Sequence, residues 1–76
     1  MQQPLSIQEL SGGQIDVLHC LFFKGPTWDG DLPSKSARDD FVQHGIIQRW
    51  EGWNFLTPYG VIFAVSKYGD RKIAGN

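Results

Sequence analysis

The feature that most constrains the fold of this chain is the stretch over residues 45–60, GIIQRWEGWNFLTPYG. Two β-rich runs flank Glu51-Gly52, where the glycine can take the positive φ that a tight hairpin turn needs. Thr57 follows with a hydroxyl that can cap the first turn of a helix, and Pro58 suits the first helical position. We therefore predict a β-hairpin that passes directly into a helix.

A two-residue loop fixes the pairing between the predicted strands 46–50 and 53–56, and alternate pairs lie on opposite faces. The expected pairs are Trp50 with Trp53, Arg49 with Asn54, Gln48 with Phe55 and Ile47 with Leu56. One face then carries Ile47 and Leu56. The large aromatic side chains of the segment share the other face, and these are Trp50, Trp53 and Phe55.

Length and composition indicate one small globular domain over residues 1–76, with an ordered core at about 5–69 and a flexible tail at 70–76. Hydrophobic residues make up 41% of the chain and charged residues 20%, which is typical of a folded protein. The formal net charge of -1 argues against a general polyanion binder. We expect a cytoplasmic protein with no membrane contact, because Cys20 is the single cysteine and the N-terminus has no export signal.

Three helices are predicted, over 12–23, 35–44 and 57–68. In the first, Ile15, Leu18 and Phe22 recur at helical spacing. Ser34 can cap the second helix and Gly45 can end it. The inner face of that second helix carries Ala37 and Phe41, and its outer face carries Lys35, Ser36, Asp39 and Gln43.

The connection over 25–34 is rich in proline and glycine and leaves room for at most one helical turn, pinned by Trp28 and Leu32. The last helix has one apolar stripe through Val65 and a second through Tyr59 and Phe63. The second stripe serves either as a homodimer contact or as the seat of an N-terminal arm whose apolar residues are Leu5, Ile7 and Leu10.

This order of elements resembles the winged helix-turn-helix domain. Residues 12–69 are similar to it, and the segment from Gly45 through Arg49 to FLTPYG is similar to the "GLIxR … YxLTxxG" pattern of bacterial winged-helix regulators. The resemblance implies an α+β fold with a recognition helix over 34–44 and a wing over 49–54. It also implies double-stranded DNA as the partner of a small phage or prophage transcriptional regulator. The DNA contacts would be Lys35, Ser36, Arg38, Gln43 and Arg49.

An alternative function stays open, because the wing tip is Trp-Glu-Gly-Trp rather than basic. On that hypothesis the fold is a protein-binding module for a host or regulatory protein. Its contacts would be Trp50, Trp53, Phe55 and Asp39. The aromatic residues are equally well explained as core, and Arg38 as the partner of an aspartate. Asp29, Asp31, Asp39 and Asp40 are interpreted as helix-start and surface charges.

No catalytic or metal site is expected, and no cofactor. His19 and Cys20 are adjacent, so on a helix they point about 100° apart and cannot act as a base and a nucleophile. His44 is interpreted as a structural residue at a helix end. The Cys and His spacing of a metal site is absent from the sequence.

Overall fold

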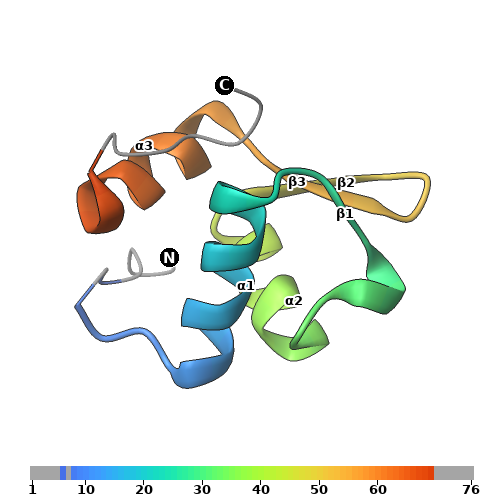
Figure 1. The fold of residues 1–76 in the computed structure, drawn as a ribbon, viewed down its shortest axis with the longest axis horizontal. Helices are drawn as coiled ribbons and strands as arrows, with labels where there is room; N and C mark the ends of the chain where they lie inside the picture. Colours follow the sequence, from blue (N-terminus) through green and yellow to red (C-terminus); the bar gives the residue numbers. More distant parts are fainter. Residues whose placement is uncertain (1–5, 7, 70–76) are drawn as a thin grey trace.

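Three helices and a small antiparallel sheet make up the part of the chain that the computed structural model describes, which is Ser6 and residues 8–69 (Figure 1). The elements in chain order are α1 (Gly12–Phe23), β1 (Thr27–Trp28), the 3-10 helix η1 (Asp29–Asp31), α2 (Lys35–Gln43), β2 (Ile47–Trp50), β3 (Trp53–Leu56) and α3 (Pro58–Tyr68). The α+β class is confirmed, with a hairpin directly before the last helix. No helix in these ranges is long and apolar enough to cross a bilayer.

Side-chain caps start all three α-helices. The Ser11 hydroxyl accepts a hydrogen bond from the Gln14 amide, and the Gln14 side chain accepts one from the Ser11 amide in return, which makes a capping box. Ser34 accepts from the amide of Ala37, and Thr57 accepts from the amide of Gly60. The caps predicted at Ser34 and Thr57 are therefore confirmed, and so is the one-turn helix of the connection, as η1.

The sheet has the strand order β1-β3-β2 and is antiparallel throughout. All four predicted pairs of the hairpin are confirmed by the observed register. Glu51 and Gly52 both have positive φ, of 51° and 84°, as a two-residue turn of this kind requires. The sequence did not predict β1. It has only two residues, and its pairing of Trp28 with Trp53 depends on a segment far along the chain.

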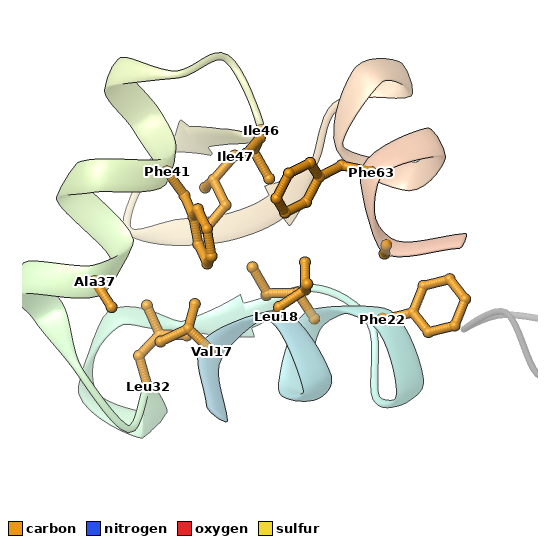
Figure 2. Close-up of a cluster of buried hydrophobic side chains, with 11 residues drawn as sticks. Val17, Leu18, Phe22, Leu32, Ala37, Phe41, Ile46, Ile47 and Phe63 are labelled. Carbon is orange, nitrogen blue, oxygen red and sulfur yellow. The ribbon is translucent and has the colours of Figure 1, made fainter. Parts of the chain in front are cut away.

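One hydrophobic core joins the helices to the inner face of the sheet (Figure 2). Figure 2 shows Val17 and Leu18 of α1 pointing toward Phe41 of α2, with Phe63 of α3 closing one side. The buried core residues are Val17, Leu18, Leu21, Phe22, Leu32, Ala37, Phe41, Ile46, Ile47, Phe63 and Ala64. Leu10 packs against this cluster, whereas Leu5, Ile7 and the predicted tail lie outside the described residues.

The junction between the hairpin and α3 is tight. The amide of Thr57 donates to the carbonyl of Ile46 at 3.0 Å, and the Thr57 hydroxyl donates to the carbonyl of Gly45. Gly60 lies so close to the residue before β2 that a Cβ placed on it would be 2.0 Å from the Ile46 carbonyl oxygen. The last helix is thereby fixed against the base of the hairpin, and the hairpin tip extends away from the helices (Figure 1).

Candidate functional site

Three tryptophans lie in one row across the outer face of the sheet. Trp28 pairs with Trp53, and Trp53 pairs with Trp50, so β1, β3 and β2 each contribute one indole at the same level. Paired residues in antiparallel strands project to the same side of the sheet. Trp28 and Trp53 are each 46% exposed and Trp50 is 67% exposed. We call Trp28, Trp50 and Trp53 the tryptophan face.

The hairpin turn holds two residues of the tryptophan face, Trp28 and Trp53, in place. The rings of Trp28 and Trp53 have centroids 5.5 Å apart and cross at 70°. Trp28 lies over the turn, because a Cβ placed on Gly52 would be only 2.6 Å from its ring. The amide of Asp29 donates to the Gly52 carbonyl at 2.9 Å and ties β1 to the same turn. Trp28 and Trp53 are therefore held by contacts with each other and with the turn.

A groove of about 480 Å³ adjoins the tryptophan face. Its lining residues are Cys20, Lys24, Pro26, Thr27, Trp28, Asp31 and Trp53. Phe55 is only half-buried and lines a separate apolar groove of about 180 Å³ between α1, β3 and α3. The alternative that the tryptophans are core is wrong for the described chain. Phe55 is neither fully buried nor fully exposed, so neither interpretation describes it completely.

The opposite side of the sheet carries a cluster of polar contacts around Asp29. Its carboxylate accepts from Arg38 Nη1 at 2.9 Å and from Asn54 Nδ2 at 2.7 Å, and it also pairs with Arg49. The hydrogen bond from Asn54, followed by that from Arg49, lowers the pKa of Asp29 below its ordinary value. Arg38 donates in addition to Asp39 at 2.8 Å. The cluster links η1, α2, β2 and β3.

The five residues that the resemblance assigned to DNA contact differ in their exposure and in their ion pairs. Lys35, Ser36 and Gln43 are exposed on α2. Arg38 is 9% exposed and is paired with aspartates, so the alternative given for it is confirmed. Arg49 keeps 42% of its side chain exposed, but its guanidinium is also committed to Asp29.

Two interpretations of surface residues need correction. Asp29 does start the short helix η1, as interpreted, but it is not a simple surface charge, because it organises the cluster described above. Phe63 is 7% exposed and packs near Phe41, with ring centroids 6.3 Å apart, so it cannot form a homodimer contact without opening the core. Tyr59 is 49% exposed, and its neighbour Ile62, which the sequence did not single out, is 68% exposed.

His19 and Cys20, the adjacent residues considered for catalysis, contact different parts of the structure. His19 packs against Phe23 and Tyr68, at centroid distances of 4.5 and 5.9 Å. Burial raises the pKa of Tyr68 above its ordinary value. Cys20 is buried, with its Sγ 3.5 Å from Thr27 Oγ1. Within the described ranges, no group of three or more His, Cys, Asp or Glu side chains is placed to hold a metal ion.

Comparisons with protein-family models, curated proteins and solved structures found no match for this chain. The sequence did not predict that Trp28 belongs to an exposed row or that Asn54 donates a hydrogen bond to Asp29. The only signal for Asn54 was its polar side chain at a position that alternation assigns to the inner face with Ile47 and Leu56.

Proposed function

We propose that this chain is a non-enzymatic protein-binding module and that the tryptophan face is its contact surface. The observation that carries the proposal is the row of three exposed indoles on adjacent strands. Tryptophan is among the residues that contribute most to the energy of protein interfaces, and isolated exposure of one would be ordinary. Three in register form a contiguous apolar surface at the centre of which a partner side chain can be desolvated.

The charges around the cluster favour a protein partner over a nucleic acid. Arg38 and Arg49, the two guanidinium groups beside the hairpin, are both paired with Asp29, and Arg38 is also paired with Asp39. Asp31 and Glu51 flank the tryptophan face and have no ion pair within the described part of the chain. A phosphate backbone approaching this side would meet the carboxylates of Asp31 and Glu51 beside the single ammonium group of Lys24.

The test is capture of a partner from an extract of the organism that encodes the chain, with two matched variants. Trp50→Ala removes an indole that is 67% exposed, and Ile62→Ala removes a side chain on α3 that is 68% exposed. Both variants should keep the circular-dichroism spectrum of the wild type, because neither side chain is in the core. The proposal expects one protein to be retained by wild type and Ile62→Ala and lost with Trp50→Ala. Retention by all three proteins would overturn it.

A second candidate is a winged-helix DNA-binding regulator of phage or prophage type. It is supported by the element order and by the polar, exposed outer face of α2, which carries Lys35, Ser36 and Gln43. Lys35→Ala should then weaken binding to duplex DNA while Lys67→Ala, on α3, should not. Equal affinity of the two variants, measured by fluorescence anisotropy of labelled DNA, would remove this candidate.

A further inference from the structure

The geometry points to the groove between Trp28 and Trp53 as a pocket for an arginine side chain of the protein partner. This inference rests on the proposed function, since it names the chemistry that the tryptophan face would recognise. The two indoles that line the groove cross at 70°, with centroids 5.5 Å apart. Two ring faces set at a steep angle can contact one planar cation on two sides.

Aromatic rings attract cations because their faces carry negative electrostatic potential, and tryptophan does so most strongly. The guanidinium group of arginine is planar and weakly hydrated, so it stacks on an indole at a lower desolvation cost than the ammonium group of lysine. The ring of Trp28 is held against the Gly52 backbone, which fixes the wall of the groove. The groove therefore suits a flat cation better than a compact one.

Charge complementarity gives the second reason. Asp31 lines the groove, and Glu51 lies in the turn next to Gly52, the residue that the Trp28 ring covers. Neither carboxylate has an ion pair within the described residues, whereas Asp29 is fully engaged with Arg38, Arg49 and Asn54. Asp31 is the single carboxylate among the lining residues and Lys24 the single cation. A guanidinium in the groove would find the unpaired carboxylate of Asp31 beside the indoles.

The experiment is an NMR titration of the full chain, labelled with nitrogen-15, with N-acetyl-arginine amide and with its neutral isostere N-acetyl-citrulline amide. The arginine probe should shift the indole Nε1–H signals of Trp28 and Trp53 more than that of Trp50, which does not line the groove. We expect arginine to bind about three- to fivefold more tightly than citrulline, in keeping with the strength of exposed cation–π contacts.

Two single-charge variants should change the arginine affinity in opposite directions. Asp31→Asn removes the lining carboxylate and should weaken binding about two- to threefold, whereas Lys24→Gln removes the competing cation and should strengthen it by a similar factor. Glu9→Gln is the control, because Glu9 is an exposed carboxylate that does not line the groove. Equal affinities for the arginine and citrulline probes, or unchanged arginine affinity in both variants, would overturn the pocket.

These outcomes are separable from the proposed function. If capture of a partner depends on Trp50 while the two probes bind alike, the protein-binding function stands and the arginine pocket is wrong. If the arginine probe meets both criteria while Trp50→Ala still captures every partner, the pocket stands and the wider contact surface is wrong.

Discussion

At the scale of single residues, Asp29 shows how one carboxylate can determine what two arginines are available to do. It accepts from Arg38, Arg49 and Asn54, side chains that belong to α2, β2 and β3. Hydrogen bonds to a charged acceptor are stronger than those between neutral groups, and here the partners converge from three elements. The guanidinium groups are consequently oriented toward the protein rather than toward solvent.

Asp29→Asn should destabilise the fold, and the loss should depend on pH. Because the folded-state pKa of Asp29 lies below its ordinary value of 3.8, the ionised form stabilises the fold at pH values above 3.8, and this stabilisation is lost as the pH falls through the folded-state pKa. The gap in free energy of unfolding between wild type and Asp29→Asn is therefore largest near neutral pH and narrows in acid. Urea denaturation across this range measures it. Asp31→Asn, the control, should show no such gap, and an equal gap at all pH values would contradict the role given to Asp29.

At the scale of elements, prediction from sequence succeeded where the determining contacts are local. The turn at Glu51-Gly52 fixes a register between residues only a few positions apart, and Ser34 and Thr57 cap helices that begin at the next residue. β1 was missed because its two residues become a strand only by pairing with β3, which lies more than twenty residues away in the sequence. The exposure of the tryptophan face could not be predicted for the same reason, since it depends on which elements cover the sheet.

Gly60 tests the close approach of α3 to the hairpin base. In Gly60→Ala the new Cβ would lie 2.0 Å from the Ile46 carbonyl oxygen, which is backbone and cannot move aside without shifting the strand. We expect a loss of about 1–3 kcal/mol in the free energy of unfolding, the usual cost of overpacking. In the control, Gly12→Ala, the Cβ would have no atom within 4 Å. Its stability in chemical denaturation should match or exceed that of wild type, and similar losses in the two variants would show that the contact is unimportant.

Gly52 tests whether the turn supports the tryptophan face. Gly52→Ala and Gly45→Ala both place a side chain at positive φ, 84° and 73°, at a cost of about 1–2 kcal/mol each. Only at Gly52 would the Cβ also meet the Trp28 ring, at 2.6 Å. Gly52→Ala should therefore be less stable than Gly45→Ala and should alone change the near-ultraviolet circular dichroism of the tryptophans. An unchanged spectrum in both variants would contradict the contact.

At the scale of the whole molecule, a chain of 76 residues has one small core and little stability in reserve. Phe63→Ala should cost about 3–5 kcal/mol, since it empties a site between α3 and Phe41. Tyr59→Ala, on the exposed side of the same helix, should stay within about 0.5 kcal/mol of wild type. Thermal denaturation measures both. A stable Phe63→Ala variant would mean that Phe63 is free for the dimer contact after all.

The charges of the whole molecule nearly balance, with seven Lys and Arg against eight Asp and Glu. Two of those arginines are paired with Asp29. Wild type should bind mixed-sequence duplex DNA weakly even at low salt. Asp29→Asn and Asp31→Asn change the net charge equally, but only Asp29→Asn releases Arg49, while Arg38 stays buried and paired with Asp39. Each released cation that contacts a phosphate adds about 0.9 to the magnitude of the slope of log affinity against log salt. Anisotropy titrations at several salt concentrations should therefore show tighter binding and a slope steeper by about 1 for Asp29→Asn alone. Equal effects of the two substitutions would mean that net charge, rather than the pairing of the arginines, sets the affinity. Tight, steeply salt-dependent binding by wild type would instead favour the DNA-binding candidate, since phosphate contacts would then be made with Asp29 in place.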